Sequence, residues 1–219
     1  MERRKASRFH TPSSLLIAGP SGCGKTVFTT KLLLENGDSF QEPSKSIHYC
    51  YGSWQDGFVE LKKGGVKFHE GIPDNEQLPR WFPRGGVLVL DDLMDEGGND
   101  KRVLDLFTKH SHHRNITVIY LCQDLFPNGK FAKTISRNAH YIVAFKNPRD
   151  QFEIRNLLLQ TFPTRWPEVL DTFRKVTDRP YGYMLLDLHP ASLDDQRVLS
   201  RVLKDEGFVR CHQFALPPC

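Results

Sequence analysis

Short apolar runs alternate with segments of helical periodicity along most of the chain. Strands are expected where the apolar runs lie, at 15–17, 46–51, 66–69, 86–90, 116–122, 141–145 and 183–188. Helices are expected at about 25–34, 100–110, 131–137, 149–160, 165–175 and 192–206. Strands that alternate with crossover helices predict an α/β fold, in which helices cover both faces of a mainly parallel central sheet.

This pattern divides the chain into three parts. A basic N-terminal arm is expected over 1–12, a core over 13–190, and a C-terminal helix with a frayed tail over 191–219. The arm contains four cations that could contact nucleic acid or serve nuclear import, although a short solvated arm is the commoner explanation. These cations are Arg3, Arg4, Lys5 and Arg8.

Composition narrows the class of protein only slightly. The 219 residues carry 30 Lys and Arg against 26 Asp and Glu, a formal charge of +4 that permits nucleic-acid binding without requiring it. The five cysteines form no C-x-x-C pair, which favours a reducing, intracellular environment. No apolar run approaches the roughly 18 residues of a membrane span, so we expect a soluble protein with no membrane partner.

The most informative motif is LLIAGPSGCGKT at 15–26, which matches the phosphate-loop pattern G-x-x-x-x-G-K-T between a strand and a helix. Such a loop wraps backbone N–H groups around a phosphate chain and directs a helix N-terminus at it. Lys25 is expected to contact the β- and γ-phosphates, and the Thr26 hydroxyl to bind Mg²⁺. The expected nucleotide-binding residues are Gly19, Pro20, Ser21, Gly22, Cys23, Gly24, Lys25 and Thr26.

Two carboxylates follow the apolar strand at 86–90. Asp91 is expected to support the Mg²⁺ ion together with Thr26, and Asp92 to accept a proton from the attacking water. The alternative is a structural strand end that leads into an acidic turn. With a complete phosphate loop upstream, the catalytic assignment is favoured.

Further polar residues could complete the site. Gln123 follows the strand at 116–122 and could hydrogen-bond the γ-phosphate or its attacking water. Arg114 ends the preceding helix, where it could act on the nucleotide of a neighbouring subunit, as trans-acting arginines do. Arg137 and Arg149 are alternatives, and each of the three could instead be an exposed structural arginine.

The paired acids separate the possible function classes. Asp92 favours hydrolysis, since a phosphotransferase gains nothing from activating water. The chain lacks the N-K-x-D motif of GTPases, so ATP is the expected nucleotide. The main alternative is a small P-loop nucleotide or metabolite kinase. A non-enzymatic nucleotide-dependent module is a third, which the paired acids disfavour.

Taken together, GPSGCGKT, VLVLDD, HSHHRNITVIYLCQDLF and ISRNAHYIVAFKNPRD resemble viral genome-packaging ATPases of the FtsK/HerA superfamily over about 13–160. The similarity is greatest to the poxvirus-type enzymes of large DNA viruses and of polinton/Maverick or adintovirus elements. The phosphate loop alone is generic, whereas the two acids, the His-rich turn and the strand ending in Gln123 are more specific.

The resemblance implies an ASCE-type P-loop core that assembles into a homo-oligomeric ring and pumps double-stranded DNA into a capsid. It implies ATP and Mg²⁺ as cofactors, capsid proteins as further partners, and action in the host cell where virions assemble. It also makes Arg114 the first choice for the trans-acting arginine. Relatives often carry this arginine slightly earlier, where His112 stands here.

Overall fold

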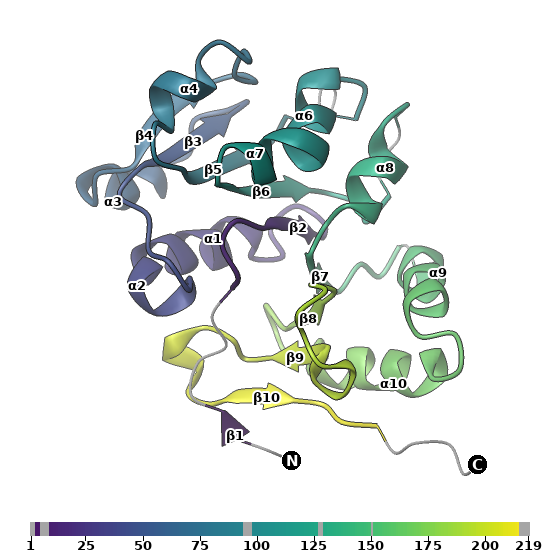
Figure 1. The fold of residues 1–219 in the computed structure, drawn as a ribbon. Helices are drawn as coiled ribbons and strands as arrows, with labels where there is room; N and C mark the ends of the chain where they lie inside the picture. The colour runs from purple at the N-terminus through teal and green to yellow at the C-terminus, as the bar shows by residue number, and fades with distance from the viewer. Residues whose placement is uncertain (1–2, 5–8, 94–97, 127–128, 150, 215–219) are drawn as a thin grey trace.

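The computed structural model describes residues 3–4, 9–93, 98–126, 129–149 and 151–214. A ten-stranded sheet in the order β1-β10-β9-β8-β7-β2-β6-β5-β3-β4 forms its centre (Figure 1). The strands are β1 Arg3–Arg4, β2 Ser14–Ala18, β3 Ile47–Tyr51, β4 Lys67–Glu70, β5 Gly86–Asp91, β6 Ile116–Cys122, β7 Tyr141–Phe145, β8 Tyr183–Asp187, β9 Val198–Ser200 and β10 Val209–Cys211.

The six strands from β7 to β4 are parallel, and β6 lies between β2 and β5. Strands β2, β5 and β6 are buried along their whole length, which agrees with their continuous apolar sequences. Beyond β7, strands β8, β9, β10 and β1 extend the sheet in antiparallel pairs. The mainly parallel core is therefore confirmed, with an antiparallel extension that the sequence did not indicate.

Helices cover both faces of this sheet, which makes the three-layer sandwich that the sequence predicts (Figure 1). Helices α1 and α3 pack on one face, and α4, α6, α8, α9 and α10 on the other. The helices are α1 Lys25–Leu34, α2 Asn36–Ser39, α3 Phe58–Lys63, α4 Leu78–Trp81, α6 Lys101–Asp105, α7 Ser111–His113, α8 Ala132–Arg137, α9 Gln151–Thr161 and α10 Trp166–Val176. No helix within the described ranges is long and apolar enough to span a bilayer.

The predicted helix at 100–110 is less regular than expected. It begins at Asp100, whose carboxylate accepts a hydrogen bond from the Arg102 amide at 2.7 Å, as an N-cap residue does. After α6 the chain continues as a π-helical turn at Leu106–His110 and then as α7. Helix α1 ends at Leu34, as predicted, and the short helix α2 begins at Asn36.

The predicted helix at 192–206 is wrong. These residues form strand β9 between two 3₁₀ turns, Asp194–Gln196 and Lys204–Glu206. Val198 and Leu199 pair with Leu186 and Leu185, so the open edge of β8 takes this segment into the sheet. Backbone pairing along an edge strand outweighs a weak local helical preference.

The boundaries drawn at the two ends of the chain also need correction. Phe9 lies within the expected arm, yet it is buried and its ring meets the rings of Phe40 and Tyr141 at centroid distances of 6.0 and 4.9 Å. The C-terminal segment is part of the sheet, and Phe214 still accepts a hydrogen bond from Arg165 at 3.0 Å. Lys5, Arg8 and the tail at 215–219 lie outside the described residues.

A buried histidine and a half-buried one stand together at the β3–β4 edge of the sheet. His48 is 1% exposed, its Nδ1 lies 2.9 Å from Nε2 of His69, and its ring stacks on Trp81 at 4.6 Å. No hydrogen-bond partner for its Nε2 exists among the described residues. Burial lowers the pKa of His48 from 6.5 to about 4, and the charges of His69 and Lys67 act in the same direction.

This depressed pKa predicts an acid-sensitive fold. The unfolded chain takes up a proton on residue 48 below about pH 6.5, whereas the folded chain does so only near pH 4, so stability falls as pH decreases through this window. Relative to pH 7, this difference in protonation lowers the free energy of unfolding by about 2 kcal/mol at pH 4.5. Urea unfolding at pH 7 and pH 4.5 should show a smaller loss for His48→Phe than for the wild type. Equal losses would contradict the assignment.

Candidate active site

The phosphate loop joins the end of β2 to the start of α1. Gly22 and Gly24 adopt left-handed backbone conformations, with φ of 77° and 109°, which glycine tolerates best. A Cβ on Gly22 would have no atom within 4 Å, so the loop is open at this point. No side chain caps the first turn of α1, which leaves its N–H groups available to an anion. This geometry fits a phosphate chain.

The Lys25 side chain folds back along the phosphate loop. Its ammonium group donates hydrogen bonds to the carbonyl oxygens of Gly19 and of Pro20, the latter at 3.1 Å. The residue is half-buried at the first position of α1. The loop therefore presents backbone amides and one ammonium group to the same space, as phosphate binding requires.

Asp91, the last residue of β5, is 5% exposed and accepts a hydrogen bond from the Tyr49 hydroxyl at 2.6 Å. Burial raises the pKa of Asp91, and the neighbouring Asp92 raises it further. The Tyr49 and Thr26 hydroxyl groups and the charge of Lys25 oppose this rise. Asp91 thus interacts with two residues of the phosphate loop motif, Lys25 and Thr26.

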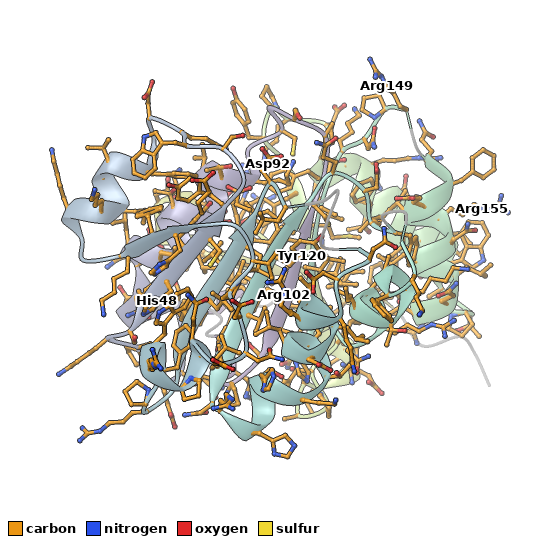
Figure 2. The ribbon with its side chains drawn as sticks, turned by 90° about the horizontal axis from the view of Figure 1, so that it is seen from above. His48, Asp92, Arg102, Tyr120, Arg149 and Arg155 are labelled. Carbon is orange, nitrogen blue, oxygen red and sulfur yellow. The ribbon has the colours of Figure 1, made fainter. Side chains whose placement is uncertain are left out.

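Asp92 follows in a left-handed conformation, with φ of 55°, and its side chain is exposed. Gly52, after β3, donates its amide to the Asp91 carbonyl at 3.0 Å. A Cβ on Gly52 would lie 2.1 Å from the Asp92 carbonyl oxygen, so only glycine fits against this turn. Close backbone packing therefore holds Asp92 in an unfavourable conformation. Figure 2 shows it in the upper middle of the view.

A pocket of about 650 Å³ brings the predicted residues together. Its volume is typical of a small-molecule site. Five of the six residues predicted to be catalytic or to bind metal line it, all except Arg114: Lys25, Thr26, Asp91, Asp92 and Gln123. Ser21, Gly22 and Gly24 of the phosphate loop line it as well. Their convergence is now a structural observation, whereas their chemical roles remain predictions.

The pocket also fits a magnesium ion. Mg²⁺ is usually held by one or two protein oxygen ligands together with substrate phosphates and water. Thr26 supplies a hydroxyl and Asp91 a carboxylate, and a hydrogen bond between these side chains contributes to the pKa of Asp91. A bound Mg²⁺ would take over the role of this hydrogen bond and favour the ionised carboxylate.

The three candidate arginines lie in different parts of the fold. Arg114 occupies the turn before β6, and its Nε donates to His110 Nδ1 at 3.3 Å. Because Gln123 follows the seven-residue β6, about 20 Å separates Arg114 from the pocket. Arg137 ends α8, ahead of β7. Arg149 follows β7 and projects outward at the top of the view in Figure 2. The structure brings none of the three into the pocket.

Three residues of the site were missed from the sequence. Tyr49 bonds Asp91, and Gln55 and Tyr181 line the pocket. Tyr49 could have been noticed as a polar-tipped aromatic in a buried strand. Gln55 and Tyr181 lie in irregular segments, where no periodicity shows which residues approach the loop.

Comparisons with known proteins reveal similarity only at the level of the fold. No protein-family model matches the chain, and no curated protein is significantly similar to it in sequence. The genome packaging NTPase B204 from Sulfolobus turreted icosahedral virus 2 has a similar structure. Its complex with ATP-gammaS superposes with a TM-score of 0.54 at 11% identity, over 81% of this chain and 93% of that chain. For the AMPPCP complex the TM-score is 0.51 at 13% identity, over 84% of this chain and all of that chain.

The chain has a P-loop NTPase fold. This agrees with the phosphate loop and with the position of β6 between β2 and β5, which is the strand arrangement of the predicted ASCE type. In a P-loop NTPase of this type, the carboxyl ends of β2, β5 and β6 form the nucleotide edge of the sheet. All five converging residues lie at this edge.

The site predicts that nucleotide binding and hydrolysis can be separated. Asp92→Asn keeps the shape of the side chain but removes the proton acceptor, so ATP should bind nearly as in the wild type while hydrolysis falls by about 10²–10⁴-fold. Fluorescent-nucleotide titration and phosphate release measure the two effects. Asp91→Asn is the matched control and should instead weaken the Mg²⁺ dependence of binding. Normal hydrolysis by both variants would make this strand end structural.

Proposed function

We propose that this protein is an ATP-hydrolysing motor that moves double-stranded DNA into a viral capsid and acts as a homo-oligomeric ring. The observation that carries the proposal is the convergence of Lys25, Thr26, Asp91, Asp92 and Gln123 on one pocket of a P-loop NTPase fold. Bound Mg²⁺ would neutralise charge on the triphosphate. The motor would work with capsid proteins inside the host cell, where virions assemble.

Each side chain in the pocket has a distinct task in this proposal. Lys25 binds the terminal phosphates, and Thr26 and Asp91 hold Mg²⁺. Asp92, exposed at the rim, accepts the proton of the attacking water. Gln123 orients this water or the γ-phosphate from the end of β6. Two paired acids beside a phosphate loop favour hydrolysis over transfer to a small acceptor.

The similarity to B204 supports the packaging part of the proposal. That protein is a genome packaging NTPase from a virus, and its fold matches most of this chain. The sequence resemblance to viral packaging ATPases rests on different observations, namely the acids, the His-rich turn and the strand ending in Gln123. Both therefore indicate the same class of motor.

A basic groove supports double-stranded DNA as the substrate that the motor moves. It has a volume of about 540 Å³ and lies at the amino ends of β3, β5 and β6, opposite the nucleotide edge. Four exposed cations line it, and none makes an ion pair with a described residue. They are Lys45, Lys67, Arg80 and Arg84. Unpaired cations in a groove suit backbone phosphates, which a sequence-independent motor must hold.

We expect double-stranded DNA to stimulate phosphate release from ATP, with an affinity that falls steeply as salt increases. Replacing Arg80 and Arg84 together with alanine should weaken the stimulation and reduce the slope of log affinity against log salt by about 2. Lys175→Ala, which removes an ion-paired cation on α10, is the matched control. Lys25→Ala should remove most of the hydrolysis by this protein, so the phosphate that this variant still releases measures contaminating ATPase. Stimulation that ignores salt, or phosphate transfer to a small acceptor, would count against the translocase.

Arg114 provides a test of the ring, because in this proposal it acts on the nucleotide of a neighbouring subunit. Arg114→Ala should bind ATP normally and hydrolyse it about 10³-fold or more slowly. Mixing it with Lys25→Ala subunits should restore part of the activity, because an intact Lys25 pocket can then meet an intact Arg114. Energy transfer between labelled subunits must show that the subunits exchange. Exchange without recovery at any mixing ratio would exclude Arg114 and direct the same test to Arg137 and Arg149.

A further inference from the structure

An exposed tyrosine stands beside the phosphate loop. Tyr181 is 70% exposed, and its Cδ1 atom lies 3.2 Å from the point where a Cβ on Gly24 would be. It lines the 650 Å³ pocket together with Lys25 and Thr26. It also lines a neighbouring pocket of about 350 Å³ that contains Gly22 and Cys23. The ring therefore borders the space next to the phosphate-binding residues.

The backbone at this position is unfavourable for a tyrosine. The Gly182 amide donates to the Arg179 carbonyl at 3.0 Å, which closes a turn with Pro180 second and Tyr181 third. Tyr181 has φ of 58°, in the left-handed region that favours glycine or asparagine at the third position of such turns. Neither burial nor local conformation thus accounts for a tyrosine here. Strained residues of this kind cluster at ligand sites.

The turn is nevertheless held firmly. Arg179 forms an ion pair with Glu206 at 2.7 Å, and the Glu206 side chain is 15% exposed. A Cβ on Gly182 would lie 2.4 Å from the Val176 carbonyl oxygen, so the turn packs closely on the end of α10. An exposed ring on a fixed turn loses little conformational freedom when it contacts a ligand.

A second apolar surface lines the same pocket. Val27, in the first turn of α1, is 58% exposed. An aromatic ring and a branched aliphatic side chain beside a phosphate loop together offer an apolar surface to a flat heterocycle. The phosphate-binding residues themselves offer only amides and charges.

We propose that Tyr181 is the stacking platform for the base of the bound nucleoside triphosphate, with Val27 providing a further apolar contact. This inference rests on the proposed function, which makes the pocket a nucleotide site. Every base has a π-face, and purines present the largest, so the platform favours purine nucleotides without reading base edges. Tyr181 would thus set affinity for the base, while Lys25 and the loop set affinity for the phosphates.

The experiment compares ATP with inorganic triphosphate, which has no base. In Tyr181→Ala, the dissociation constant for Mg·ATP should rise about ten- to a hundredfold, while that for inorganic triphosphate stays at the wild-type value. Tyr181→Phe keeps the ring and should bind both ligands as the wild type does. Phe208→Ala removes an exposed aromatic that lines neither pocket and is the matched control.

Each outcome distinguishes the inference from the proposed function. Unchanged ATP affinity in Tyr181→Ala overturns the base platform alone, and so does an equal loss for ATP and inorganic triphosphate, which would mean that the ring supports the loop. If the wild type binds neither ligand, the proposed function fails. Tyr181→Gly guards against misfolding, because glycine relieves the left-handed strain. Its thermal midpoint should equal or exceed that of the wild type, with the same selective loss of ATP affinity.

Discussion

The parallel alignment of β2, β6 and β5 is the constraint on which the site depends. Ala18 pairs with Cys122 and Leu90 with Tyr120, so all three strands reach their carboxyl ends at the same level of the sheet. The Gly19 amide also donates to the Cys122 carbonyl at 3.2 Å, which ties the phosphate loop to the end of β6. Residues distant in sequence therefore meet in one pocket, because parallel strands present their ends together.

Burial distinguishes the two carboxylates at the phosphate-binding edge of the sheet, Asp91 and Asp92. Asp91 is removed from water but receives hydrogen bonds from Tyr49 and Thr26, so a carboxylate is kept where an isolated one would be costly. Asp92 stands one residue further and is exposed. Two adjacent carboxylates thus have different surroundings, which suits one to hold a cation and the other to exchange protons with water.

Two of the four non-glycine residues with a left-handed backbone among the described residues border the same pocket. Asp92 and Tyr181 both adopt left-handed conformations, and both are held by neighbouring glycines that admit close packing. Gly52 fits against Asp92, and Gly182 fits against the end of α10. Conformations of this kind lower stability unless the surrounding structure enforces them. Here the enforced residues are the proposed general base and the proposed base platform.

The sequence by itself determined the core of the sheet and its phosphate-binding edge. A continuous apolar run specifies a buried strand locally, as at 116–122, and the spaced glycines and lysine of the phosphate loop specify its turn. The convergence of Lys25 with Asp91 follows, because both stand at the carboxyl ends of parallel strands. Only the tertiary structure decided the rest. The segment around Val198 has helical spacing yet joins the sheet, since the free edge of β8 offers backbone hydrogen bonds that no local pattern records. Tyr181 reaches the loop for a similar reason, because a turn far along the chain folds back against Gly24, and sequence distance carries no information about such contacts.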